Sequence, residues 1–231
     1  MPYFGFYFDP TYILVIIGTL ICAIASMNVS NTYRKYSEVT NRRGLKAEEV
    51  AAQMLREAGI FDVKIQRVGG NLTDHYSPKE KVLRLSDSVY GSTSVAAIGV
   101  AAHECGHAIQ HNTKYLPLTL RSASVPMANI GSFIYWPVII LGIILGRPEL
   151  ATFGVILFSF VVVFQLITLP VEFNASNRAM KILSERNILA ETELKHAGKV
   201  LGAAALTYVA SLFNSILQLL RLVLLTRRSD D

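Results

Sequence analysis

Three long runs without a charged side chain limit how this chain can fold more than any other feature. They cover Thr11–Val29, Ser122–Gly146 and Leu150–Val171, which are 19, 25 and 22 residues long. About 20 apolar residues in a helix cross the hydrocarbon core of a bilayer. The sequence therefore predicts a mostly α-helical, multi-pass membrane protein with spans at about 11–29, 122–146 and 150–171.

A fourth segment, Val200–Leu225, is also apolar but carries Gln218 and Arg221. We expect it to span as well, with a position partly in the membrane interface as the alternative. The overall composition agrees, because 52% of the residues are hydrophobic, which is high for a soluble domain of this length.

Basic residues follow the first span closely, at Arg34, Lys35, Arg42, Arg43 and Lys46. The positive-inside rule places such a cluster in the cytoplasm. We therefore expect one membrane domain over 1–231 in the cell membrane, with cytoplasmic catalytic parts at 30–121 and 172–199.

The net charge of +5 fits an inner-leaflet bias. No RNA- or DNA-binding motif accompanies it, so we expect the lipid bilayer and not a nucleic acid as partner.

Cys22 and Cys105 are not expected to form a disulfide. The sequence does not indicate an oligomeric state.

The first predicted cytoplasmic part contains a short series of elements. The stretch 44–60 has the apolar spacing of an amphipathic helix. Val63–Val68 and Lys81–Ser86 alternate as strands do, and we take the second as a candidate open edge for an extended peptide. An alanine-rich helix is then expected to start near Ser92 or Ser94.

This last helix carries the stretch "AAHECGHAIQH", with His103, Glu104 and His107 in the order HExxH. Residues four apart share one helix face, so both histidines can point at one zinc ion. Glu104 can then take a proton from the water that such an ion activates. Zinc needs a third protein ligand, and two residues qualify.

The first candidate is His111, but eight residues of helix rise about 12 Å, too far for His103 and His111 to share one ion. The second is Glu172, which follows the third apolar run and returns to the same membrane face. A helix starting after Pro170, with the carboxylate favoured by its dipole, also explains Glu172.

Together, "AAHECGHAIQH" and "LPVEFNASNRA", with "YFDPTYILVIIG" and "LTDHYSPKEKVLRLSDSVY", resemble the YugP-type membrane neutral zinc metallopeptidases over nearly the whole chain. The similarity to HtpX-like proteases and CAAX prenyl endopeptidases is more distant. The resemblance implies a gluzincin-like catalytic helix, one zinc ion on His103, His107 and Glu172, and Glu104 as the general base.

Ser176 stands where the HtpX-like pattern has an aspartate that orients a ligand histidine. Ser176 or Asn177 could take that role through a hydroxyl or an amide. A donor to the oxyanion is also needed, and Asn177, Arg178, His75 and Tyr76 are candidates in nearby polar stretches.

These observations predict a zinc endopeptidase at the cytoplasmic membrane surface that cuts membrane or membrane-associated proteins. The alternative is a non-enzymatic membrane scaffold with a vestigial metal site, but an intact Glu104 argues against it. A channel or transporter would need ionisable residues deep in the spans, and the first three spans have none.

Overall fold

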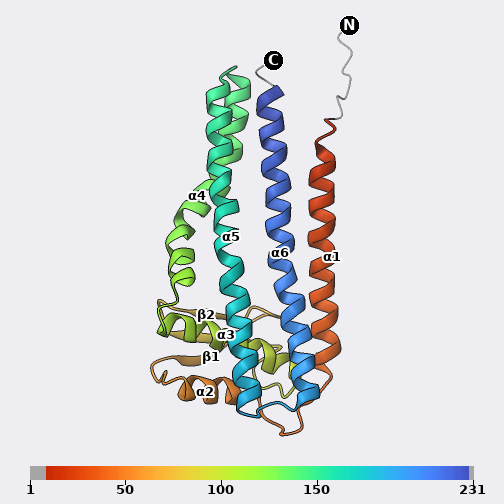
Figure 1. Cartoon of the computed structure of the whole chain (residues 1–231), viewed down its shortest axis with the longest axis vertical. Helices are drawn as coiled ribbons and strands as arrows, with labels where there is room; N and C mark the ends of the chain where they lie inside the picture. The colour runs from red at the N-terminus through yellow and green to blue at the C-terminus, as the bar shows by residue number, and fades with distance from the viewer. Residues whose placement is uncertain (1–8, 229–231) are drawn as a thin grey trace. The chain divides into compact units, whose positions relative to one another are not determined.

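The computed structural model describes residues 9–228, and Figure 1 labels its elements. Tyr7 and Phe8, at the start of one segment behind the family resemblance, lie outside this range. The described elements are α1 (Tyr12–Ser37), α2 (Ala47–Glu57), β1 (Lys64–Val68), β2 (His75–Ser77), β3 (Val82–Ser86), α3 (Val95–Asn112), α4 (Leu116–Ile144), α5 (Pro148–Glu185) and α6 (Glu191–Arg228).

Four of these helices, α1, α4, α5 and α6, are long and apolar enough to cross a membrane. The expectation of a mostly helical chain with long apolar helices and a small sheet is confirmed at this level. The helices run past the apolar stretches: α4 starts at Leu116 and α5 ends at Glu185. Backbone hydrogen bonding continues into polar turns, which a search for uncharged runs does not register.

The chain divides into two compact units. Unit 1 comprises Met1–Ala25, Ala123–Leu166 and Tyr208–Asp231, and unit 2 comprises Ser26–Ser122 and Ile167–Thr207. The cytoplasmic location of any part of the chain stays a prediction.

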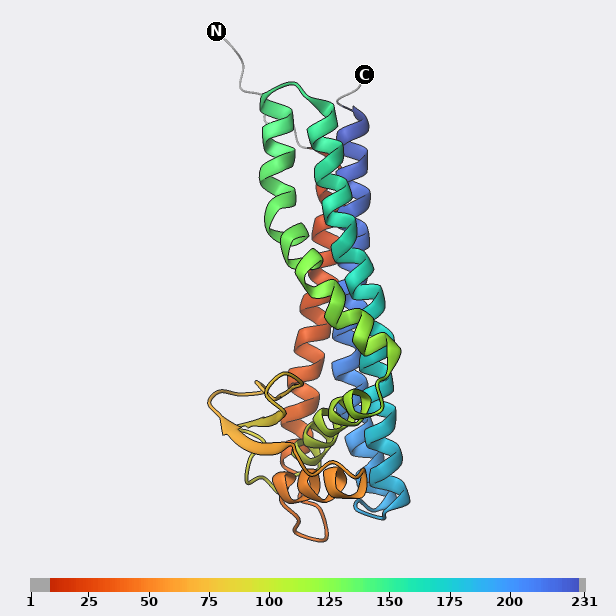
Figure 2. The same cartoon turned by 90° about the vertical axis from the view of Figure 1, so that its left-hand side faces the viewer.

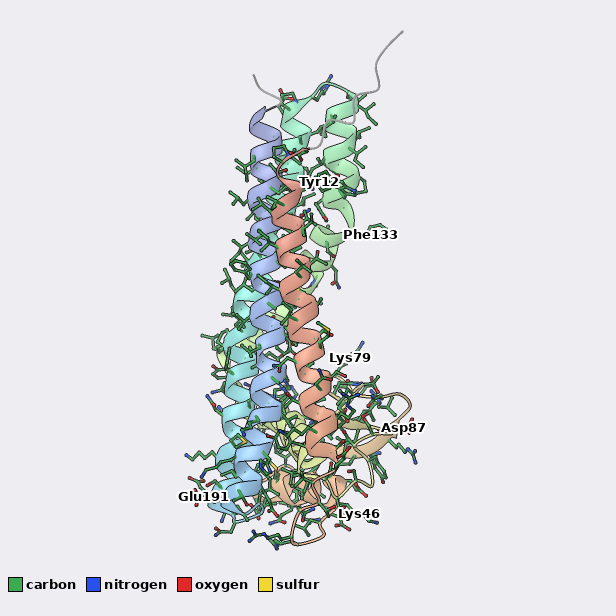
Figure 3. The ribbon with its side chains drawn as sticks, turned by 90° about the vertical axis from the view of Figure 1, so that its right-hand side faces the viewer. Tyr12, Lys46, Lys79, Asp87, Phe133 and Glu191 are labelled. Carbon is green, nitrogen blue, oxygen red and sulfur yellow. The ribbon has the colours of Figure 1, made fainter. Side chains whose placement is uncertain are left out.

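In unit 1, glycines allow helix backbones to approach closely. A Cβ on Gly131 would lie 2.5 Å from the Leu157 carbonyl oxygen, and one on Gly154 would lie 2.9 Å from that of Tyr135. Such contacts through small residues are typical of helices that pack within membranes. Large apolar side chains face outward, and Phe133, labelled in Figure 3, is 82% exposed. This surface suits a lipid environment.

Unit 2 packs α2 and a three-stranded sheet around α3, as Figure 2 shows for the orange and yellow-green elements. Its core is formed by apolar side chains such as Met54, Leu83, Leu85 and Ile98, all fully buried. The amphipathic helix expected over 44–60 is observed as α2 (Ala47–Glu57).

The free cysteines Cys22 and Cys105 form no disulfide.

The sheet has the order β1-β3-β2. Strand β3 pairs in parallel with β1, where Ile65 is opposite Leu83, and antiparallel with β2, where Tyr76 is opposite Leu83. Our expectation that Lys81–Ser86 forms an open edge is therefore wrong, because β3 is the central strand. The third strand, β2, is only three residues long, and strand alternation in the sequence is hard to recognise over so short a stretch.

Helix α3 starts where the sequence indicates, because Ser94 is its N-cap and the Ser94 hydroxyl accepts a hydrogen bond from the Ala97 N–H at 3.1 Å. Most of the helix is buried. Helix α5 continues through Pro170 without a new start. Glu172 is therefore not the N-terminal carboxylate that the alternative interpretation assumed.

Candidate metal centre

Three potential metal ligands converge inside unit 2. His103 and His107 on α3 and Glu172 on α5 offer ligand atoms that all lie within 4.8 Å of one another. Glu172 Oε2 is 3.3 Å from His103 Nε2 and 3.5 Å from His107 Nε2. The Glu172 side chain is only 3% exposed, and the histidine side chains are 15% and 12% exposed. One carboxylate oxygen therefore faces both imidazoles in a nearly closed space.

The spacing fits a zinc ion. With bonds of about 2.0–2.1 Å in a tetrahedral arrangement, two ligand atoms stand about 3.3 Å apart. Glu172 Oε2 is also buried without a hydrogen-bond partner among the described residues, and a buried polar atom without a hydrogen bond is costly. A cation held by these three side chains would remove that cost, so the residues present fit zinc.

Hydrogen bonds determine which nitrogen of His107 carries the proton. Gln110 Nε2 donates to the Val171 carbonyl at 2.8 Å and to Asn174 Oδ1 at 3.0 Å. Gln110 Oε1 is therefore the atom that lies 3.0 Å from His107 Nδ1, and it can only accept. Nδ1 then holds the proton, and Nε2 presents a lone pair to the centre. Such a partner both orients a ligand histidine and selects its tautomer.

The other two ligands also have polar partners. His103 Nδ1 lies 3.0 Å from the Ser176 hydroxyl. Arg121 Nη1 lies 3.3 Å from Glu172 Oε1, which leaves Oε2 directed at the histidines. Each ligand is thus held on the side away from the centre, as ligands of zinc sites usually are.

A glycine brings the two ligand-bearing helices together. A Cβ on Gly106 would lie 2.4 Å from the Ala175 carbonyl oxygen. Gly106 directly precedes the second histidine, and Ala175 lies between Glu172 and Ser176. Contact at this point therefore places α5 close enough for the Glu172 carboxylate and the Ser176 hydroxyl to reach the histidines of α3.

Glu104 and its neighbour Cys105 have different surroundings. Glu104 is 8% exposed and accepts no hydrogen bond from the described residues, so its carboxylate is available for chemistry. The Cys105 thiol is fully buried and lies 3.6 Å from the Ala51 carbonyl oxygen. Burial raises the pKa of this thiol far above its usual range, which suits a packing residue.

The pKa of His107 is also shifted. Burial lowers it, but contact with Glu172 and the negative charges of Glu104 and Glu172 outweigh burial. The pKa therefore lies above the usual value for histidine. Without a metal, Nε2 takes up a proton readily, and a proton and a metal ion would compete for the same lone pair.

The remaining predicted site residues lie elsewhere in unit 2. His111 is exposed, and its Nδ1 is 2.9 Å from the Tyr76 hydroxyl. The ring of His75 contacts the Thr73 carbonyl and Arg84. Neither histidine belongs to the three-ligand cluster.

The two polar residues after Ser176 differ in their contacts. Asn177 is exposed. Arg178 donates to Asn174 Oδ1 at 2.8 Å and stacks over Tyr115, with its guanidinium carbon 5.6 Å from the ring centroid. Arg178 therefore supports the amide network around Gln110 and does not itself contact the ligands.

Sequence reasoning missed three residues near the ligands. Gln110 follows His107 by three positions on a helix, a spacing that could have signalled their contact. Asn174 and Arg121 carry no such signal, because each reaches the centre through packing between α3, α4 and α5.

Comparison with known proteins identifies the family. The family model described as "Putative neutral zinc metallopeptidase" matches residues 11–227. The chain belongs to this family. It is also 44% identical over 207 residues to the "Putative membrane protease YugP" of Bacillus subtilis (strain 168), covering 90% of this chain and 92% of that protein. The resemblance to YugP-type metallopeptidases is thereby confirmed. No solved structure matches the chain.

Proposed function

We propose that this protein is a zinc-dependent endopeptidase that hydrolyses peptide bonds of membrane or membrane-associated proteins at the cytoplasmic membrane surface. The convergence of His103 Nε2, His107 Nε2 and Glu172 Oε2 carries the proposal. Two neutral histidines and one carboxylate are a ligand set of catalytic zinc, which keeps a further position for water or substrate. Membership of the neutral zinc metallopeptidase family supports the same reaction.

When bound, zinc would supply a Lewis acid that acidifies water and polarises the peptide carbonyl. Glu104 then acts as general base: its carboxylate accepts the proton of the attacking water and later donates it to the leaving amine. The carboxylate accepts no hydrogen bond from other described side chains. It therefore has lone pairs free for this transfer.

Contacts with surrounding residues fix the orientation of each ligand side chain. Gln110 holds the proton of His107 on Nδ1, Ser176 positions His103, and Arg121 holds Glu172. Preorganisation of this kind matters because a ligand that has to rotate on binding weakens the metal site.

An extended substrate would pair with β2, the edge strand that contacts α3. Tyr76 on this strand is hydrogen-bonded to His111 near the end of the motif helix, so the edge lies beside the helix that carries the centre. Backbone pairing at a sheet edge binds peptides with little dependence on sequence. This assigns to β2 the role that the sequence had suggested for Lys81–Ser86.

The substitution Glu104→Gln tests the proposed function. The amide keeps the size of the side chain but cannot accept a proton from water. We expect zinc affinity within about tenfold of the wild type and no measurable peptide hydrolysis. Near-normal turnover in this variant would exclude the general-base role, and a wild-type protein without zinc or hydrolysis would favour the scaffold alternative.

A further inference from the structure

A cavity of about 490 Å³ opens in unit 2 beside the candidate metal centre. It lies between the end of α3, the first turns of α4 and the loop that joins β2 to β3. Buried Gln110 and Leu118 and the ring of Tyr115 form part of its wall, and exposed Lys79 and Lys114 also line it. Lys79 is labelled in Figure 3. The volume of the cavity falls in the range of cavities that bind small ligands or single side chains.

The cavity shares a residue with the metal centre. Gln110 lines the cavity, and the same amide lies 3.0 Å from the Nδ1 atom of His107. All polar atoms of this amide are engaged, since Nε2 donates to Val171 and Asn174. Gln110 therefore forms a fixed wall and is not itself a binding group. A peptide cut at the centre could extend a neighbouring residue into this space.

The charged side chains that line the cavity are all basic. None of its lining residues is acidic, and Lys79 and Lys114 have no carboxylate partner among the described residues. The basic residues nearest in sequence differ, because Lys81 pairs with Asp62 and Arg84 with Glu80. Two lysines without a partner in a concave site attract an anion more strongly than lysines on a flat surface.

We propose that this cavity binds a carboxylate of the peptide substrate and makes the enzyme prefer acidic residues near the scissile bond. The carboxylate is either an Asp or Glu side chain or the free C-terminus of the substrate. This inference rests on the proposed endopeptidase function and adds a substrate class to it. The shared Gln110 favours a peptide over a lipid phosphate, because it connects the cavity to the reacting centre.

The test uses the full-length, zinc-loaded protein in an uncharged detergent. The probes are fluorescence-quenched hexapeptide mixtures in which one position is fixed in turn as Glu, Gln or Leu. Each mixture is made with a free C-terminus and with an amidated one. We expect Glu to be preferred over Gln at one position if a side chain is recognised, and free acids over amides if the C-terminus is recognised.

The double variant Lys79→Gln, Lys114→Gln should lower kcat/KM for the preferred acidic peptides about tenfold, since each partly exposed ion pair contributes about threefold. Cleavage of neutral peptides should change less than twofold. The matched control is Lys181→Gln, Lys195→Gln, which removes the same charge from lysines paired with Glu185 and Glu191. The control should keep the preference for acidic peptides.

Equal cleavage of the Glu, Gln, free-acid and amidated series by the wild type would overturn the inference while leaving endopeptidase activity in place. If no peptide is cleaved, the proposed function fails, and the cavity is tested by binding. Fluorescence anisotropy then compares labelled Glu and Gln hexapeptides on the Glu104→Gln protein. A carboxylate site is supported if the Glu peptide binds more tightly than the Gln peptide and if adding Lys79→Gln and Lys114→Gln removes this difference. Equal binding, or a lysine-dependent response to phosphatidylglycerol vesicles alone, overturns it.

Discussion

The substitution Gly106→Ala tests whether close contact between α3 and α5 assembles the metal centre. The added Cβ would lie 2.4 Å from the Ala175 carbonyl oxygen, whereas ordinary contacts begin at 3.4 Å. The helices must therefore separate by about 1 Å at this point. Functional metal sites hold their distances within about 0.2 Å, so Glu172 would lose its fit to the two histidines.

Two effects on stability oppose each other in this variant. Overpacking costs about 1–3 kcal/mol, while replacing glycine by alanine inside a helix gains about 1 kcal/mol. We therefore expect a net loss of up to about 2 kcal/mol in the free energy of unfolding, with most helical structure retained. Zinc affinity should fall about 10- to 100-fold, as when a residue that positions a ligand is removed.

Gly202→Ala provides the matched control, because nothing lies within 4 Å of a Cβ at this helical position. It should leave zinc affinity unchanged and stability equal or slightly raised. Zinc titration against a competing chelator and thermal unfolding by circular dichroism would compare the wild type and both variants. If Gly106→Ala bound zinc like the wild type and unfolded at the same temperature as the control, our explanation of the α3–α5 contact would be refuted.

Three further predictions follow from the ligands and the basic cluster. Glu172→Ala should weaken zinc more than His111→Ala, which should cost no more than about 100-fold; a chelator titration giving the reverse order would contradict the ligand assignment. The apparent zinc affinity should fall as the pH drops from 8 to 6. The pKa of metal-free His107 is raised, so protons compete with zinc for its Nε2 atom in this range. A zinc affinity that does not change with pH would show that His107 does not bind the ion. A cysteine at Ser37, which is exposed, should react with impermeant reagents from the cytoplasmic side only, and added labelling from outside, relative to the parent chain, would invert the topology.

Local sequence signals predicted several elements well, because their causes are local. Ser94 caps α3 through its own hydroxyl, and the spacing of His103 and His107 follows from helical periodicity. The long apolar runs predicted the candidate membrane helices. The weakest predictions concerned strand pairing: β2 is too short to recognise, so the sheet edge was assigned to the wrong strand.

The sequence by itself determined the chemistry that is available: an HExxH helix, a glutamate after the third apolar run and a chain rich in apolar helices. The tertiary structure decided which groups meet. Gly106 lets α5 approach α3 until Glu172 Oε2 lies 3.3 Å and 3.5 Å from the two imidazoles, and Gln110 selects the tautomer of His107. The physical reason is that a metal centre depends on distances of a few ångströms between helices far apart in the chain, which packing sets and local periodicity does not.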